Sequence, residues 1–572
     1  MKKTICLTVL IASTTLLYAQ TNTNIVGAGK VIDPYHYNIV KSKFFNKASV
    51  SCAHPLGSLV GAQIMKQGGN AFDAVIATQL VLAVVYPGAG NIGGGGFLVG
   101  HTPAGKNITI DYRETAPSKG SRNMYLDSTG KVVTNLSVLG HLASGVPGTI
   151  AGLFATIPFA KLSMKTLIQP AIDIAEFGFV ITEREANSLN ATKESFIKNS
   201  TTPTAFVKAT KWQAGDTLIQ KELAATLKRV RDFGQKGFYE GKTADLITNE
   251  MQRGKGIISK DDLKNYKAKT RTALTFNYKN YNIIGMPPPS SGGIIVLQMM
   301  KMIAQKPLAS YGFQSTKAVQ LMIEVERRAF ADRAEHLGDP DFWKVPLKTL
   351  TKNTYITKRM ADYDSTKATP SSSITSGIIH ESDETTHISA MDSKGNMVSV
   401  TTTLNGGYGS RTVIGGAGFI INNEMDDFSV KPGVPNMYGA IGGEANAIQP
   451  NKRMLSSMTP CLVLQNSKPY IVCGTPGGTT IPTSVFQTLV NLLEFNMSVE
   501  EAVNQPKFHH QWLPDEVAVE PGFPKYVATQ LQAMGYKITQ RGAIGRTEVI
   551  RMLKGKLETA ADKRGDDSVA GY

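Results

Sequence analysis

A change in sequence character near residue 385 constrains the fold more than any other feature of this chain. Residues 364–376 are rich in Ser and Thr around a single Pro, a composition that buries little apolar surface and predicts an exposed connector. Residues 388–392 and 397–404 flank Ser393-Lys-Gly-Asn396, which predicts two strands joined by a turn. Thr385 therefore lies where a cleavable segment meets a rigid strand.

Thr385 has two interpretations. If the chain is cut before it, its free α-amine lies beside its own hydroxyl and acts as the base for that nucleophile. Alternatively, Thr385 and Thr386 simply open a strand, as β-branched residues often do. This stretch alone favours the second interpretation, and the rest of the chain reverses that preference.

The first residues predict export. Two lysines precede an apolar run at residues 5–17, and Ala19 precedes Gln20, which is the pattern of a secretory signal over residues 1–19. The run is too short to serve as a bilayer-spanning anchor. We therefore expect an exported mature chain, in the periplasm as the first choice and as a secreted protein as the second.

The net charge argues against one class of function. The formal charge is +16, or +14 once the two lysines of the signal are removed, which favours attraction to anionic surfaces. No run of five or six basic residues occurs, and no basic stretch alternates with aromatic residues. We therefore do not expect nucleic acid as a partner.

Cysteine, histidine and acidic residues give no metal pattern. Once Cys6 leaves with the signal, Cys52, Cys461 and Cys473 remain, and this odd number without metal-ligand spacing predicts small core residues, at least one of them unpaired. The nine histidines form no tight cluster. The pair Asp426-Asp427 fits a solvated turn or a metal site, but a lone acidic pair rarely suffices for a metal.

Two patterns in the first half of the chain predict a tight turn after a helix and a charged side chain at the end of a strand. Residues 71–85 predict a helix capped by Asn70, and the glycine-dense residues 87–96 follow it. No Gly-Lys-Ser/Thr comes after these glycines, and residues 97–99 predict a strand, so we expect a tight packing turn more than a phosphate cradle. Arg113 ends a strand pattern, either as a salt-bridged residue or as a fork that grips a substrate carboxylate.

Taken together in their order, these segments and several more resemble bacterial γ-glutamyltranspeptidase. The resemblance runs from about Ala53 to Tyr572, nearly the whole mature chain. The segments that carry it are Asn91-Ile-Gly-Gly-Gly-Gly-Phe97, Pro287-Pro-Pro-Ser-Ser-Gly-Gly293, Glu381-Ser-Asp-Glu-Thr-Thr-His-Ile-Ser389, Asn422-Asn-Glu-Met-Asp-Asp-Phe-Ser429, Asn451-Lys-Arg-Met-Leu-Ser-Ser-Met458 and Phe508-His-His-Gln-Trp-Leu-Pro-Asp515.

The resemblance implies an N-terminal-nucleophile hydrolase. The expected fold class is α+β: a four-layer αββα sandwich with two central sheets between helical layers. A large chain, residues 20–384, and a small catalytic chain, residues 385–572, would arise from one self-cleaved precursor and form one interleaved unit. The cut would fall between Glu384 and Thr385.

The resemblance also assigns roles to individual residues. Thr385 would be the nucleophile, with its freed amine as base, and Thr403 would assist it through a hydrogen bond. The substrate's carboxylate would be bound by Arg113, Ser456 and Ser457, and its ammonium by Asn405, Glu424 and Asp427. The oxyanion hole would be formed by Gly477 and Gly478, and Tyr438 would belong to a lid over the pocket. A zwitterionic head group needs such a guanidinium fork on one side and carboxylates on the other.

The implied reaction is attack of Thr385 on the γ-amide of glutathione or a related γ-glutamyl donor. The resulting ester would pass its γ-glutamyl group to water, an amino acid or a short peptide. No metal or organic cofactor is implied, and the two chains would be each other's partners.

Some departures from the family pattern leave alternatives open. Thr479 and Thr480 stand where Ser-Arg is usual, and Met454 replaces a usual proline; these positions bear on acceptor preference and rate. The competing interpretations are a related acylase acting on β-lactam side chains, a poly-γ-glutamate-processing enzyme, and an exported binding protein that never matures. An intact Tyr438 segment and a full glutamate pocket count against the acylase.

Overall fold

The computed structural model describes residues 32–374, 385–431 and 443–572. Three features predicted above, the signal at residues 1–19, Glu384 at the cut and Tyr438 in the lid, lie outside the described residues.

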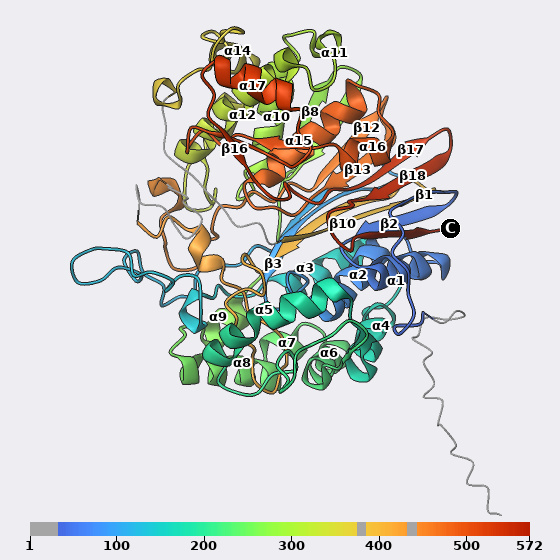
Figure 1. Ribbon diagram of the computed structural model, residues 1–572. Coiled ribbons are helices and arrows are strands. Elements are labelled where there is room, and N and C mark those ends of the chain that lie inside the picture. The colour runs from blue at the N-terminus through green and yellow to red at the C-terminus, as the bar shows by residue number, and fades with distance from the viewer. Residues whose placement is uncertain (1–31, 375–384, 432–442) are drawn as a thin grey trace, which may run out of the picture.

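Two antiparallel sheets form the centre of the molecule, and within the described residues each has seven strands. The upper sheet of Figure 1 contains, in spatial order, β1 (Ser42–Phe45), β18 (Lys556–Ala561), β17 (Glu548–Leu553), β13 (Lys468–Gly474), β12 (Cys461–Gln465), β9 (Tyr281–Gly285) and β8 (Leu274–Tyr278). The lower sheet contains β19 (Ser568–Gly571), β2 (Ala48–Cys52), β10 (Thr385–Asp392), β11 (Met397–Thr403), β3 (Gly95–His101), β4 (Asn107–Asp111) and β7 (Lys269–Thr270). In both sheets, strands from before residue 384 lie next to strands from after it.

Helices cover the outer face of each sheet (Figure 1). The lower layer contains α1 (Pro55–Lys66), α2 (Ala71–Val85), α3 (Thr149–Thr156), α4 (Met164–Phe177), α5 (Glu183–Asn199), α6 (Lys221–Phe233), α7 (Lys236–Tyr239), α8 (Gly241–Gly254) and α9 (Lys260–Asn265). The upper layer contains α10 (Gly292–Ile303), α11 (Leu308–Tyr311), α12 (Thr316–His336), α13 (Leu347–Leu350), α14 (Asn353–Arg359), α15 (Thr480–Leu493), α16 (Val499–Asn504) and α17 (Lys525–Ala533). Short strands β5 (Phe179–Val180), β6 (Thr217–Leu218), β14 (Phe508–His509), β15 (Val517–Val519) and β16 (Ile538–Gln540) lie outside the main sheets. The predicted αββα sandwich is confirmed.

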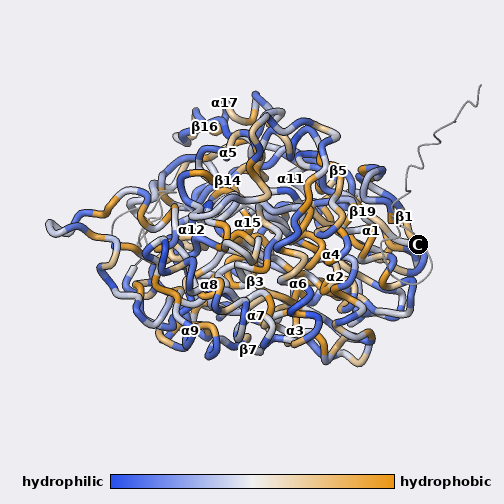
Figure 2. The backbone as a smooth tube through the Cα atoms, turned by 90° about the horizontal axis from the view of Figure 1, so that it is seen from below, coloured by the Kyte–Doolittle hydropathy of each residue, from blue (hydrophilic) through white to orange (hydrophobic). Residues whose placement is uncertain are grey.

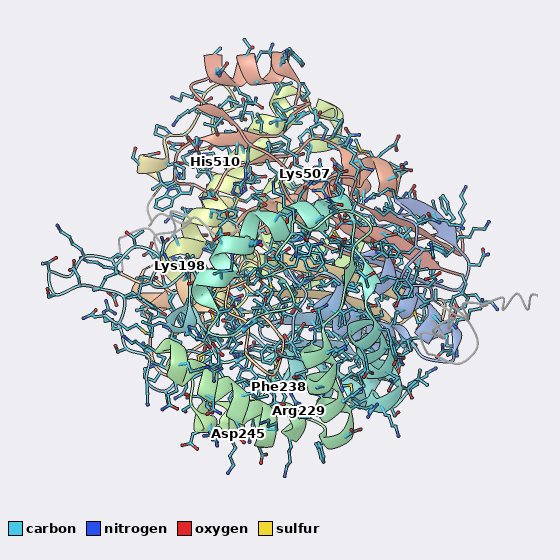
Figure 3. All side chains as sticks on the ribbon, turned by 60° about the horizontal axis from the view of Figure 1, so that its bottom comes forward. Lys198, Arg229, Phe238, Asp245, Lys507 and His510 are labelled. Carbon is cyan, nitrogen blue, oxygen red and sulfur yellow. The ribbon has the colours of Figure 1, made fainter. Side chains whose placement is uncertain are left out.

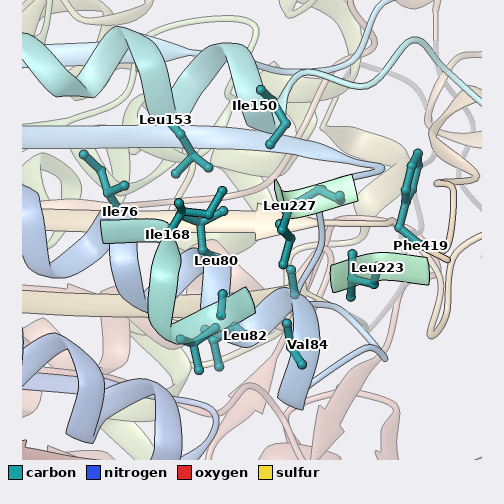
Figure 4. Close-up of a cluster of buried hydrophobic side chains, with 14 of the residues drawn as sticks. Ile76, Leu80, Leu82, Val84, Ile150, Leu153, Ile168, Leu223, Leu227 and Phe419 are labelled. Atoms are coloured by element: carbon teal, nitrogen blue, oxygen red, sulfur yellow. The ribbon is translucent and has the colours of Figure 1, made fainter. Parts of the chain in front are cut away.

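Each pair of neighbouring layers has its own apolar core. The lower core lies between the lower sheet and helices α1 to α9; Figure 4 shows its centre, where Leu80 and Val84 of α2 meet Leu227 of α6 and Ile168 of α4. The upper core joins α10, α12 and α15 to the upper sheet. A third core, which includes Phe97 and Met391, fills the space between the sheets. The hydrophobic segments accordingly concentrate inside the molecule and the hydrophilic ones at its edge (Figure 2).

The predicted strand pair around residue 393 is present as β10 and β11. The two strands run antiparallel, with Thr385 opposite Thr403 and Met391 opposite Met397. β2 flanks β10 and β3 flanks β11, so the hairpin lies in the interior of the sheet. Because both of its edges are paired, Thr385 starts a strand whose position is fixed from two sides.

The glycine-dense run acts as a packing device, as predicted. A side chain at Gly94 would collide with the carbonyl oxygen of Thr403, and one at Gly96 would collide with the carbonyl oxygen of Thr401. Backbone can approach this closely only where no Cβ intervenes. The run therefore presses β3 against the strand that carries Thr403.

The prediction of an exposed connector at residues 364–376 is wrong for part of its described length. Ser371 is buried and donates a hydrogen bond to the carbonyl of Trp512 at 2.5 Å, and Ile374 is also buried. The Trp512 indole donates in return to the carbonyls of Ser371 and Ile374, at 2.9 and 3.0 Å. This long-range docking gives the segment the order that its own composition does not supply.

The helical layers also bury polar side chains. Figure 3 places Lys507 and His510 in the upper layer, and burial lowers their pKa values to about 8 and about 4. Cys52, Cys461 and Cys473 are buried and unpaired, as predicted for core residues. Among the described residues, none of the helices is both long and apolar enough to cross a membrane.

Candidate active site

Thr385 and Thr403 form the centre of the site. They are directly opposite each other at one end of the β10–β11 hairpin, and both are buried. The Thr403 hydroxyl accepts a hydrogen bond from the backbone N–H of Asn405 at 2.7 Å. This bond fixes the Thr403 oxygen, so the hydroxyl next to Thr385 has a defined position.

His387 lies next along the same strand, two residues from Thr385. Its Nδ1 is 2.9 Å from the Thr401 hydroxyl, and Thr401 is its cross-strand partner. Burial lowers the pKa of His387 to about 3, so the imidazole is neutral near pH 7. The ring packs against Gly474, where a Cβ would collide with it. We therefore give His387 a structural role under the nucleophile.

Arg113 lies just beyond the end of β4 and is completely buried. Its guanidinium forms ion pairs with Glu424, at 2.5 Å, and with Asp427. It also donates to the carbonyl of Leu455 at 3.2 Å, beside the Ser456-Ser457 pair. Both interpretations of Arg113 from the sequence are therefore compatible: it is salt-bridged, and its fork faces a polar pocket.

The charges around Arg113 do not balance. Among the described residues, Glu114, Glu424 and Asp427 all lie on this one guanidinium. Burial raises the pKa of Glu424 to about 8 and that of Glu114 to about 8, although Arg113 lowers both. One cation thus holds more carboxyl groups than it can neutralise, and part of this cluster retains a proton near pH 7.

Ser456 and Ser457 are held by the turn that precedes α10. The N–H of Ser456 donates to the carbonyl of Pro289 at 3.0 Å, and the N–H of Ser291 donates to the carbonyl of Ser456 at 2.7 Å. Arg333 of α12 donates to the hydroxyl of Ser457 at 3.0 Å. The Pro-Pro-Pro-Ser-Ser turn therefore supports the serine pair.

Gly477 and Gly478 form the turn between β13 and α15. Both have positive φ, +133° and +56°, which only glycine adopts at low cost at such a turn. The Thr480 hydroxyl donates to the carbonyl of Gly477 at 2.6 Å, so the unusual threonine stabilises this turn. The turn precedes the positive end of the α15 dipole, which favours negative charge there.

A cavity of about 20 Å³ brings most of the predicted site residues together. Glu424 lies behind it on Arg113, and Gly477 faces a neighbouring cavity. Sequence reasoning missed Glu114 and Arg333: Glu114 is adjacent to Arg113 and was open to inference, whereas Arg333 has no local signal. The residues that line the small cavity are Arg113, Thr385, Thr403, Asn405, Asp427, Ser456, Ser457, Met458, Gly478 and Ile481.

No group of three or more His, Cys, Asp or Glu side chains suited to hold a metal ion occurs in the described part of the chain. The arrangement that does occur is a hydroxyl nucleophile candidate beside a buried guanidinium and carboxylates. Such a pocket suits a ligand that carries both a carboxylate and an ammonium.

Comparison with known proteins decides the family. The model of the family described as Gamma-glutamyltranspeptidase matches residues 57–572. The chain belongs to this family. The glutathione hydrolase proenzyme of Escherichia coli K12 is 42% identical over 550 residues, which are 94% of this chain and 95% of that relative.

Solved structures agree with this membership. Helicobacter pylori γ-glutamyltranspeptidase is 42% identical with a TM-score of 0.56, over 57% of this chain and 94% of the solved one. A cephalosporin acylase from Bacillus halodurans has a TM-score of 0.82 over 96% of this chain and 99% of its own, at 23% identity. The second likeness shows the fold alone.

Proposed function

We propose that this member of the γ-glutamyltranspeptidase family is a self-processing enzyme that cleaves γ-glutamyl amides such as glutathione. It transfers the γ-glutamyl group to water, an amino acid or a short peptide. It acts after export, in the periplasm, as residues 20–384 and 385–572 paired in one unit. The signal pattern at residues 1–19 supports the location, and the matching name of the Escherichia coli relative supports the substrate.

One observation carries this proposal. Arg113, with Asp427 on its guanidinium, lines the same small cavity as Thr385. A γ-glutamyl donor presents an α-carboxylate and an α-ammonium at one end and a reactive amide three carbons away. Arg113 with Ser456 and Ser457 would hold the carboxylate, and the acidic side of the pocket would hold the ammonium.

The chemistry follows from the nucleophile. The Thr385 hydroxyl attacks the γ-carbonyl carbon while its proton passes to the α-amine of Thr385. The N–H groups at Gly477 and Gly478 stabilise the developing oxyanion. The C–N bond then breaks, the leaving amine takes the proton, and a γ-glutamyl ester of Thr385 remains. Attack by water or by an acceptor amine releases the product and restores the hydroxyl.

The size of the cavity adds a requirement. About 20 Å³ is room for about one water molecule. A glutamyl head group therefore needs the pocket to widen, and we propose that the substrate's carboxylate and ammonium take over Arg113 and Asp427 as this ion pair opens. We infer that the ion pair holds the shape of the pocket in the absence of donor.

The proposal is tested with the purified mature protein. We expect intact mass spectrometry after denaturation to show two chains, the smaller beginning at Thr385. We also expect release of the aniline from a γ-glutamyl anilide but not from the matching glutaryl anilide, which lacks only the α-ammonium. A single uncut chain that cleaves neither anilide would overturn the proposal. A preference for the glutaryl substrate would favour the acylase.

The raised pKa of Glu424 predicts how donor binding changes with pH. The carboxyl group has a pKa of about 8, so it gains its negative charge as the pH rises through this value. Because the charged form attracts the donor's ammonium, we expect the donor KM to fall about tenfold across this range, equivalent to about 1.4 kcal/mol. Steady-state kinetics from pH 6.5 to 9 measure it.

Two variants separate Glu424 from its neighbour in this experiment. Glu424→Gln should lose the pH dependence of KM, because an amide does not titrate. Glu114→Gln should keep it, although burial raises the pKa of Glu114 to the same value, about 8. A Glu424→Gln enzyme with the wild-type pH profile would show that Glu424 does not face the ammonium.

A further inference from the structure

A chain of hydrogen bonds joins the turn at Gly477 and Gly478 to the segment that follows β14. It begins at Thr479, directly after the two glycines, whose buried hydroxyl donates to Oε1 of Gln511 at 2.7 Å. The same oxygen is 2.7 Å from Nε2 of His509. Nδ1 of His509 is in turn 2.8 Å from the hydroxyl of Thr483. The chain therefore leaves the start of α15 and returns to the same helix.

The spacing along α15 makes these contacts a bridge. Thr479, Thr483 and Gln487 follow one another at intervals of four residues, so their side chains share one face of the helix. This face packs against β14 (Figure 2). Nε2 of Gln487 donates to the carbonyl of Phe508 at 2.6 Å, and its Oε1 accepts from the N–H of Phe508 at 3.2 Å. Successive turns of α15 are thus tied to residues 508–511.

The direction of each hydrogen bond in the bridge follows from the groups that form it. An amide oxygen only accepts, so the Thr479 hydroxyl and the Nε2–H of His509 both donate to Gln511. In the neutral imidazole Nδ1 then accepts from the Thr483 hydroxyl. Nε2 of Gln511 donates to the carbonyl of Leu513 at 3.3 Å, and all four bridge side chains are buried. A buried polar network with matched partners favours one arrangement.

The turn held by this bridge presents its N–H groups to a ligand. Among the described residues, the N–H groups of Gly477 and Gly478 donate to no protein acceptor. Their carbonyls are both occupied, by the N–H of Thr480 at 3.0 Å and by that of Ile481 at 3.1 Å. Two successive glycines leave the backbone wide conformational freedom, so the direction of these N–H groups depends on what holds the residue after them.

We propose that Gln511 is a positioning residue for the reaction: it holds Thr479 and thereby aims the N–H groups of Gly477 and Gly478 at the developing oxyanion. The inference rests on the proposed function. Formation and breakdown of the ester both pass through an oxyanion at the γ-carbonyl, so a loosened turn slows both steps. The donor's head group binds at Arg113, and its neutral carbonyl gains less from the turn than the oxyanion does, so donor binding changes little.

The test measures kcat and donor KM separately for hydrolysis of a γ-glutamyl anilide, with turnover normalised to the amount of chain cut before Thr385. We expect Gln511→Met and Thr479→Val, each close in shape to the residue it replaces, to lower kcat about tenfold and to leave the donor KM within about twofold. Removal of an oxyanion donor itself costs a factor of about 10² to 10³, whereas here the donors remain but are less well aimed. Thr479→Ser keeps the hydroxyl and should keep the wild-type kcat.

A double variant and a control separate positioning from general damage to α15. Because the two side chains act through one hydrogen bond, the double variant with Thr479→Val and Gln511→Met should be no slower than the slower single variant. Thr488→Val is the matched control. Thr488 is a buried threonine of the same helix, and its hydroxyl donates to the carbonyl of Ser484 at 2.7 Å. This variant should keep the wild-type kcat.

Several results would overturn the positioning role alone. They are a wild-type kcat in either Gln511→Met or Thr479→Val, additive losses in the double variant, and a loss in Thr479→Ser or Thr488→Val as large as that in Thr479→Val. A raised donor KM at unchanged kcat would place Gln511 in donor binding and overturn the role as well. Absence of donor hydrolysis in the wild type would overturn the proposed function and this inference with it.

Discussion

Replacing Thr385 with alanine should give a single uncut chain without measurable turnover of a γ-glutamyl donor. Thr385 supplies the only oxygen that the proposed mechanism uses both to cut the chain and to form the ester. Loss of a nucleophile typically costs a factor of about 10⁴ to 10⁶ in rate. Denaturing electrophoresis detects the uncut chain, and release of the aniline from a γ-glutamyl anilide measures the activity.

Two controls distinguish loss of chemistry from loss of fold. Thr385→Ser keeps a hydroxyl and should be cut and active at a reduced rate. Thr386→Ala removes a hydroxyl at a neighbouring buried position whose side chain points to the opposite face of the sheet, and it should still be cut. A Thr385→Ala protein that is cut and active would sink the mechanism.

Replacing Arg113 with alanine should leave chain cleavage intact but greatly weaken donor use. The variant removes the fork proposed for the α-carboxylate, and a bidentate charged contact of this kind supports a fall in kcat/KM of about 10²- to 10³-fold. It also leaves Glu424 and Asp427 buried without this cation, so we expect the free energy of unfolding to fall by about 3 kcal/mol or more. Thermal unfolding and donor kinetics measure the two effects.

The two effects separate with matched variants. Arg113→Lys keeps the charge but not the fork, and should recover more stability than activity. Arg453→Ala removes another buried arginine, 3.2 Å from Asp111, that does not line the small cavity. It should lose stability with far less effect on the donor KM. An Arg113→Ala enzyme with wild-type donor kinetics would contradict the assignment.

The strands and turns that carry the site were predicted from local sequence patterns. The predicted strand pair around residue 393 and the predicted tight packing turn are both present, and the structure adds that Thr385 lies opposite Thr403 and that Gly94 packs against Thr403. The composition of residues 364–376 misled because the partner that orders Ser371 is Trp512, 141 residues away. Arg333 was missed for the same reason, since Ser457 lies 124 residues from it.

The composition of the pocket could not be predicted from single residues without the family resemblance. From its local sequence, Arg113 was more often a solvated or salt-bridged residue than a substrate fork, because neither Glu424 nor Asp427 is its neighbour along the chain. The family resemblance brought these residues together before the structure did. It did not show that Glu114 shares the same guanidinium, or that the cavity beside the Arg113–Asp427 pair has a volume of only about 20 Å³.

The alternation of strands from the two halves of the chain has a consequence for the processed protein. A cut before Thr385 leaves β10 and β11 between β2 and β3, and β12 beside β9, so the boundary between the products runs through both sheets and the three cores described above. Pulling the products apart would strip the hydrogen-bonding edges of β2, β3 and β9 and expose apolar interior. Dilution separates the subunits of an ordinary dimer into folded monomers, but the two products here have no separate folded state. Loss of one product would therefore denature the other.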